Sequence, residues 1–503
     1  MLLAFVALVS LVSAACGSTV QGGTTTAASG PGAAQSGSGT ANELGESAGA
    51  TDRGVAAEGP SAAARRQAAA AAAANAAATR RPGADSGVAA TTIKIGITYT
   101  ENAAAANAAL GGRGITTGNE RRDAEIVIEE INRTGGLLGR RIVPVFRVRE
   151  GQTAEPISAQ SQAECVFFTQ DQKVFAVLQG NGQVDWETKP CLNDRGVPVI
   201  TAHISSLDDD ERRNGVNVDV SGMSVGRMAD AIVGAIGDSG WVSPWNAATG
   251  QAGVAKATVG VLGYELPAVR QAIDRTLVPG LRALGAAPAA ENVVLIPLPA
   301  SQAEIAASAA AVQNASLRLR GNGVDHIVLM DQGGALTLIF ANNAYSQGWF
   351  PRYAGSSSNG FQALLSGGSI PADVMRGAAG AGWQPVIDLP AAGNGPFLHA
   401  DRKRCGDLMR AGGQTFADAN AEAVALGYCD KLFFLRAVLS KASAPTLAGY
   451  ATALDILGPF GTARGIESRF GPGRRDGAAG YYNLAFDAGC RCMTYSGPRR
   501  TVP

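Results

Sequence analysis

Strands and helices alternate along most of this 503-residue sequence, and this pattern restricts the fold more than any other feature. Short runs rich in Val and Ile, typical of buried strands, recur between stretches in which apolar residues have helical spacing. The clearest strands are expected at 92–98, 141–148, 174–178, 197–201, 257–262, 293–296 and 326–330. Such alternation predicts parallel sheets covered by helices on both faces. Because the pattern exceeds the length of one doubly wound sheet, we expect an α/β protein with two doubly wound, Rossmann-like lobes.

Composition and motifs exclude several classes of function. The 42 Lys and Arg residues balance the 42 Asp and Glu residues, so the chain has no net charge that would attract nucleic acid. The sequence has no P-loop, no HExxH or CxxC ligand spacing, and only three His residues. We therefore expect a protein that is not an enzyme and that uses neither a cofactor nor a metal.

The N-terminal segment indicates export. Met1 to Ala15 form a short apolar stretch that ends in small residues, as in a secretory signal peptide, and Cys16 follows directly. A Cys in this position resembles that of a bacterial lipobox, where it carries a lipid anchor. The alternative is an ordinary secretory signal with Cys16 near its cleavage site by chance. Residues 16–90 are rich in Ala, Gly, Ser and Thr and predict a disordered tether, so the expected location is extracytoplasmic, anchored to the bacterial cell membrane.

The remaining cysteines agree with export, because disulfides persist in oxidising compartments. Their even number favours complete pairing, and local spacing favours partners that are neighbours along the chain. The favoured pairs are Cys165–Cys191, Cys405–Cys429 and Cys490–Cys492.

Several segments resemble the type-I periplasmic binding proteins. The strand IKIGITYT at 93–100 is followed by a helix that ends in EIN at 130–132 and then by GGLLGR at 135–140. Later segments follow in the family's order, among them KVFAVLQGNG at 173–182 and ALGYCDKLFFLRAVLSKA at 425–442. From about residue 91 to the end, the chain resembles the branched-chain amino acid and amide-binding branch of ABC-transporter substrate-binding proteins.

This resemblance implies two lobes that are joined by three crossovers and close over a small ligand. It assigns residues 91–222 and 378–445 to lobe one, and residues 223–377 and 446–503 to lobe two. It also implies that the loops after the strands contact the ligand. The residues at these positions are Tyr99, Thr100, Asn181, Gln183, His203 and Ser205 in lobe one, and Tyr264, Asp331 and Gln332 in lobe two.

These residues also have explanations that involve no ligand. Tyr99 and Tyr264 are suited to packing, His203 to a surface loop, and Asp331 to capping the next helix. In amino acid binders of this family, an acid from the loop that corresponds to 356–359 pairs with the ligand ammonium, and here that loop contains no acid. Either Asp331 supplies the charge or the ligand has no ammonium group.

These features together predict a membrane-tethered lipoprotein that captures a small polar ligand between its lobes and delivers it to an ABC permease. The expected ligands are branched-chain or other amino acids, or amides. One alternative is a ligand-sensing receptor lipoprotein that signals to a membrane partner without transport. Another is a binding fold that has lost its ligand and has only a structural role.

Overall fold

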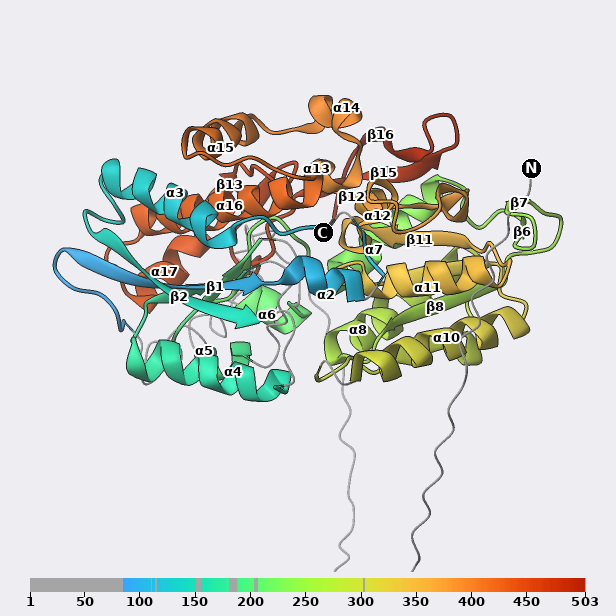
Figure 1. Cartoon of the computed structure of the whole chain (residues 1–503), viewed down its shortest axis with the longest axis horizontal. Helices are drawn as coiled ribbons and strands as arrows, with labels where there is room; N and C mark the ends of the chain where they lie inside the picture. Colours follow the sequence, from blue (N-terminus) through green and yellow to red (C-terminus); the bar gives the residue numbers. More distant parts are fainter. Residues whose placement is uncertain are drawn as a thin grey trace, which may run out of the picture. The chain divides into compact units, whose positions relative to one another are not determined.

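The computed structural model describes residues 85–502, apart from 110, 114, 151–154, 181–187, 203–206 and 302–303. Two large β-sheets organise these residues, one of five strands and one of seven (Figure 1). Each sheet has helices on both faces and its own hydrophobic core. The prediction of an α/β fold with two lobes is therefore confirmed.

Lobe one is built on five parallel strands in the order β2-β1-β3-β4-β5. Their bounds are β1 Thr92–Glu101, β2 Arg141–Glu150, β3 Ala176–Leu178, β4 Val199–Thr201 and β5 Val218–Asp219. The apolar side chains Ile93, Ile95 and Ile97 of β1 are fully buried, as expected for a strand inside a parallel sheet. This strand order is that of a flavodoxin-like doubly wound sheet, whose ligands bind where the strand order reverses.

Helices cover both faces of the lobe-one sheet (Figure 1). One face carries α3 Glu120–Arg133, α15 Ala400–Ala411, α16 Ala419–Lys441 and α17 Leu447–Asp455, and the other carries α4 Ile157–Val166 and α5 Thr188–Asp194. The short helices α2 Ala103–Ala109 and α6 Asp209–Asn214 follow β1 and β4. The α3 sequence explains its position, because Ala124, Val127, Ile128 and Ile131 form a buried stripe at helical spacing.

Lobe two repeats the same arrangement and adds two strands. Its parallel strands have the order β9-β8-β10-β11-β12, and β15 and β16 extend the sheet in antiparallel orientation. The strand bounds are β8 Val259–Tyr264, β9 Val293–Ile296, β10 His326–Met330, β11 Arg352–Ser356, β12 Ala379–Gly382, β15 Gly480–Asp487 and β16 Cys492–Thr501. The helices are α7 Val225–Asp238, α8 Pro267–Ala272 and α9 Val278–Ala283 on one face, and α10 Ile305–Gly321, α11 Ala335–Ser346 and α12 Phe361–Ser366 on the other. Smaller elements are the hairpins β6 Trp245–Asn246 with β7 Gln251–Ala252 and β13 Gly458–Phe460 with β14 Ser468–Phe470, and the short helices α13 Pro385–Asp388 and α14 Ala391–Asn394.

The chain crosses between the lobes three times. Core residues change lobe between Val220 and Met223, and residues of the two lobes' cores alternate along 383–398 and along 463–478. The sequence resemblance predicts lobe boundaries at 378 and 446. The second and third crossovers lie further along the chain than these two positions. β12 pairs within the lobe-two sheet, and α17 packs in lobe one, where Tyr450 contacts Phe175 edge to face. An amphipathic helix such as α17 can bury its apolar face in either lobe, so its own sequence does not choose between them.

Among residues 85–502, as far as the structure describes them, three disulfides form, and each one joins residues of a single lobe. In lobe one, Cys165–Cys191 links α4 to α5, and Cys405–Cys429 links α15 to α16. In lobe two, Cys490–Cys492 spans the turn between β15 and β16. These are the pairs that the local spacing favours.

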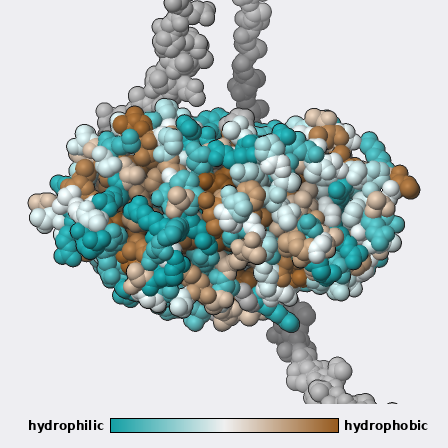
Figure 2. All heavy atoms as spheres, turned by 90° about the horizontal axis from the view of Figure 1, so that it is seen from above, coloured by the Kyte–Doolittle hydropathy of each residue, from teal (hydrophilic) through white to brown (hydrophobic). Residues whose placement is uncertain are grey.

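Among the described residues, no helix combines the length and the apolar character that crossing a bilayer requires. Figure 2 shows hydrophobic residues on one face in small patches between hydrophilic ones. The most exposed large apolar side chains, Val254, Ile456 and Leu317, come from separate elements. The predicted signal peptide, Cys16 and most of the predicted tether lie outside the described residues.

Candidate functional site

A pocket of about 510 Å³ lies at the carboxyl end of β1. Two segments line it: residues 99–104, which end β1 and begin α2, and residues 116–121, which lead into α3. β1 lies between β2 and β3, so the pocket is beside the place where the strand order of lobe one reverses. Tyr99 and Thr100, two of the predicted ligand contacts, line the pocket.

Glu120 forms a buried part of the pocket wall. It is the first residue of α3, whose N-terminus is capped by Asn119 through a 3.1 Å hydrogen bond from Arg122 N. The Glu120 side chain accepts hydrogen bonds from Thr100 N at 3.3 Å and from Tyr428 Oη at 2.9 Å. Glu120 is only 2% exposed. Its carboxylate is held in place by the hydrogen bonds from β1 and α16.

Lys431 lies one helical turn after Tyr428 on α16, outside the pocket lining. Its ammonium donates to the backbone oxygen of Gln179 at 2.6 Å and lies 3.8 Å from the centre of the Tyr428 ring. Burial lowers the pKa of Lys431 to about 7, although the charge of Glu120 raises it. Lys431 therefore connects the late helix α16 to the end of β3, at the other side of the same reversal point.

A second carboxylate lies behind Glu120. Asp123 is 1% exposed and accepts a hydrogen bond from Gln414. Burial raises the pKa of Asp123 to about 7, against the effect of the Gln414 hydrogen bond, and the charge of Glu120 raises it further. The Asp123 carboxyl and the Lys431 amine are thus buried neighbours of Glu120 that do not line the pocket.

The loop at the edge of the pocket also contacts lobe two. Thr116 donates from its backbone N and its hydroxyl to Asp418 Oδ2, at 3.0 and 2.9 Å, which fixes the loop to the start of α16. Arg113 N donates to the Ser369 hydroxyl at 2.7 Å, and this hydroxyl donates to the Arg113 carbonyl at 3.1 Å. Ile115 packs against the lobe-two core. The pocket loop is therefore a direct contact between the lobes.

The predicted lobe-two contacts lie at the equivalent strand ends, after β8 and β10. Both Asp331 oxygens accept hydrogen bonds at 2.7 Å, Oδ1 from Gln332 N and Oδ2 from the backbone N and hydroxyl of Thr337. Asp331 is 1% exposed, and burial raises its pKa against these hydrogen bonds. Its contacts are those of the helix-capping alternative. Tyr264 is partly buried beside it, and burial raises the pKa of its hydroxyl above the ordinary value.

Four predicted contacts, Asn181, Gln183, His203 and Ser205, lie outside the described residues and stay predictions. Sequence reasoning missed Glu120, Tyr428 and Lys431 as members of the site. The signal that could have found them is the polar and charged residues at 428–431, which stand among the apolar residues in the middle of α16, because a charged side chain is rarely buried without a partner.

Several solved structures with a similar architecture are substrate-binding proteins of ABC transporters. No protein-family model matches the sequence, and no curated protein matches it. A possible leucine/isoleucine/valine-binding protein from Rhodopirellula baltica aligns at 14% identity and a TM-score of 0.55, over 81% of this chain and 97% of its own. A fatty acid ABC transporter substrate-binding protein from Thermomonospora curvata aligns at 18% identity and a TM-score of 0.53, over 82% of this chain and 94% of its own. A solute-binding protein of R. palustris in complex with 4-hydroxybenzoate aligns at 15% identity and a TM-score of 0.51, over 82% of this chain and 98% of its own.

The chain has the type-I periplasmic binding protein fold. The alignments cover nearly the whole length of each of these proteins, and both lobes share one strand order across three crossovers. At these identities the likeness establishes the fold and leaves the ligand open.

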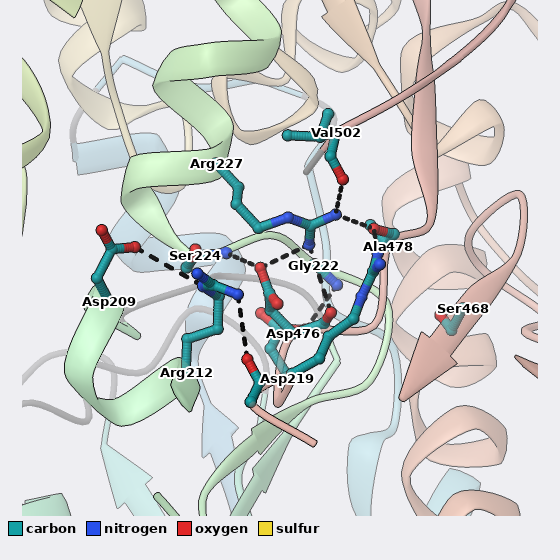
Figure 3. Close-up of polar contacts among 12 residues, drawn as sticks. Asp209, Arg212, Asp219, Gly222, Ser224, Arg227, Ser468, Asp476, Ala478 and Val502 are labelled. Carbon is teal, nitrogen blue, oxygen red and sulfur yellow. Dashed lines mark hydrogen bonds and ion pairs between the residues drawn. The ribbon is translucent and has the colours of Figure 1, made fainter. Parts of the chain in front are cut away.

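In this binding-protein fold the first and third crossovers meet in a buried polar network (Figure 3). Arg227 Nη1 forms an ion pair with Asp476 Oδ2 at 2.7 Å, and Nη2 donates to the carbonyls of Ala478 and Val502 at 3.0 and 3.1 Å. Asp476 Oδ2 also accepts from Ser224 N at 2.7 Å. One guanidinium thereby ties the start of α7 to the third crossover and to the C-terminal strand region.

Asp219 makes the stability of this network dependent on pH. Burial raises its pKa from the ordinary 3.8 to about 7, against a hydrogen bond from Gly222 N and with a further increase from Asp476. The folded state therefore binds the Asp219 proton more tightly than the unfolded state does. The stability that protonated Asp219 contributes is fully present below about pH 4 and is lost as the pH rises to about 7. We expect the Asp219→Asn variant to become more stable relative to the wild type between pH 4 and pH 8, measured by urea unfolding.

The exposed Asp210 on α6 provides the control, because the Asp210→Asn variant should show no such change with pH. A constant difference in stability between the Asp219→Asn variant and the wild type over this range would contradict the assignment.

Proposed function

We propose that this protein is an extracytoplasmic solute-binding protein of an ABC transporter. It captures a small polar ligand between its lobes and delivers it to the permease subunits, without transforming it. The observation that carries this proposal is the pocket at the reversal point of lobe one, because Arg113, shortly before its lining segment at 116–121, forms hydrogen bonds with Ser369 of lobe two. The type-I binding protein fold supports it, since the aligned structures belong to transporter substrate-binding proteins.

The proposed ligand contacts come from strand ends of both lobes. They are Tyr99, Thr100, Asn181, Gln183, His203 and Ser205 from lobe one, and Tyr264, Asp331 and Gln332 from lobe two. A ligand that touches both sets binds the closed arrangement better than the open one, and this difference in affinity shifts the population towards closure. The permease then recognises the closed form. Branched-chain amino acids, other amino acids and amides are the proposed ligands.

The proposed location is the outer surface of the cell membrane, with a lipid on Cys16. The three disulfides support export, because such bonds are maintained in oxidising compartments. The residues between Cys16 and the folded part would then serve as the tether.

Thermal unfolding tests the proposed function. Purified protein, freed of bound ligand by unfolding and refolding, is screened against amino acids, amides, ureas and small carboxylates. A true ligand at a hundredfold excess over its dissociation constant should stabilise the protein by about 2.7 kcal/mol. The absence of a shift with every compound, in protein shown by circular dichroism to be folded, would contradict a solute-binding role for these ligand classes.

A further inference from the structure

The Cys490–Cys492 disulfide differs from the two disulfides of lobe one in its exposure. Three of the four lobe-one cysteines are 1% exposed, and Cys191 is partly buried. Cys490 lies exposed in the turn between β15 and β16, whereas its partner Cys492 is only 8% exposed. The Cys490 end of this bond is therefore open to solvent. Exposed disulfides are the ones that exchange readily with thiols, because a thiolate must reach the sulfur that it attacks.

The turn that carries this disulfide is also held by contacts that do not use it. Asp487 Oδ1 accepts hydrogen bonds from Gly489 N at 2.6 Å and from Cys490 N at 3.3 Å. On the other strand, Met493 directly follows the disulfide and is fully buried, and its backbone N donates to Gln362 Oε1 of α12 at 2.7 Å. These contacts involve no sulfur atom, so we expect them to persist when the bond opens.

The bond closes a very short loop. Its sequence separation is 2, whereas that of Cys405–Cys429 is 24. By the chain-entropy relation, opening a loop of about 3 residues raises the unfolded population about 20-fold less than opening a loop of about 25 residues. The folded protein can therefore lose this bond and keep its structure. Arg491, between the two cysteines, has a φ of 55° in the left-handed region, and an open turn allows it to relax.

We propose that Cys490–Cys492 is a thiol–disulfide exchange site, through which the folded protein accepts two electrons from a dithiol. The site lies in lobe two, and the inference does not depend on the proposed solute-binding function. Cys490 is the residue that the incoming thiolate attacks, because it is the exposed end of the bond. Cys492 is the leaving group and stays in the sheet, where it pairs with Asp487.

The exchange takes place in two steps. In the first, one thiolate of the dithiol forms a bond to Cys490 Sγ, the bond between Cys490 and Cys492 breaks, and its electron pair leaves with Cys492 Sγ. In the second, the other thiolate of the dithiol attacks the dithiol sulfur bound to Cys490, which closes the dithiol's own disulfide and releases Cys490 Sγ as a thiolate. The two cysteine thiolates take up the two protons that the dithiol has released. The dithiol is thus oxidised by two electrons, and the cysteine pair is reduced by two.

Partial reduction of the native full chain tests the proposal. The protein is treated with limiting dithiothreitol at mildly alkaline pH, the free thiols are alkylated, and the tryptic peptides are identified by mass spectrometry. Cleavage after Arg491 separates the two cysteines into the peptides 476–491 and 492–499, which stay joined only while the disulfide is intact. We expect this bond to open at least about tenfold faster than either lobe-one disulfide, with an unchanged circular dichroism spectrum.

A monothiol identifies the attacked sulfur, because limiting glutathione leaves a mixed disulfide on it. Glutathione should be found on Cys490, and its attachment to Cys492 would overturn the assignment of the two roles. Earlier or simultaneous opening of a lobe-one disulfide would overturn the exchange site, and so would loss of the folded spectrum when only Cys490–Cys492 is reduced.

The double variant Cys490→Ser with Cys492→Ser is the matched control. It should release no thiol under the conditions that open this bond in the wild type. Thiol release from the folded double variant at the wild-type rate would show that another bond reacts, which would overturn the proposal. If the double variant does not fold, the peptide map of the wild type still decides which bond opens first.

Discussion

Replacing Arg227 by Met lowers the free energy of unfolding by about 3–5 kcal/mol, because it breaks a buried ion pair on one side only. The Arg227 and Asp476 side chains are 3% and 0% exposed, so water cannot replace the lost guanidinium. Met retains much of the apolar stem, but it leaves the Asp476 carboxylate without its cation and the carbonyls of Ala478 and Val502 without that donor. Urea unfolding followed by circular dichroism measures the change.

The exposed pair Arg270–Glu265 is the matched control. Its side chains are 54% and 58% exposed and the N–O distance is 3.6 Å, so the Arg270→Met variant should lose at most about 1 kcal/mol. A loss of less than about 1 kcal/mol in the Arg227→Met variant would show that the crossover network contributes little to stability.

Removing the Cys405–Cys429 disulfide by replacing both residues with Ala costs about 3.5 kcal/mol. The bond closes a loop with a sequence separation of 24, and the chain-entropy relation for a loop of about 25 residues gives this value. Both residues are 1% exposed in the lobe-one core, so the two lost sulfur atoms also leave a packing defect. Chemical denaturation at a fixed pH measures the difference from the wild type.

The Cys490–Cys492 disulfide gives the internal comparison. Its sequence separation is 2, and the same relation predicts a loss of only about 1.6 kcal/mol when both residues are replaced by Ser. Equal losses from the two double variants would contradict the dependence on loop length. A larger loss at the turn between β15 and β16 would indicate that this bond holds the edge of the lobe-two sheet in register.

The fold could be predicted from the sequence because apolar runs alternate with helical patterns along the chain. β1, with alternate Ile residues, and β10, which is buried throughout and apolar after His326, illustrate this signal. β12 carried no such signal, since its sequence is AGAG and the neighbouring backbone at Gly355 lies too close for a side chain at Gly380. The positions of the second and third crossovers could not be predicted either. They depend on whether β12 and α17 pack in lobe one or in lobe two, and the sequences of these two elements do not decide this.

The strand-end rule located one side of the pocket. Tyr99 and Thr100 lie at the carboxyl end of β1, so their place in the lining could be inferred from the order of strands. The hydrogen-bond partner of Glu120 could not be inferred in this way, because Tyr428 lies 308 residues further along the chain. Only the folding of α16 onto α3 brings these groups together, and no local pattern encodes that contact.

The disulfides have a consequence for mechanics. Each one ends within the lobe where it begins, so within the described part of the chain no disulfide links the lobes, and the main chain at the three crossovers joins them. Bending between the lobes requires rotation about backbone bonds at these crossovers and leaves each of these sulfur–sulfur bonds unstretched. The cross-links therefore resist unfolding of each half without making the joint between the halves any stiffer.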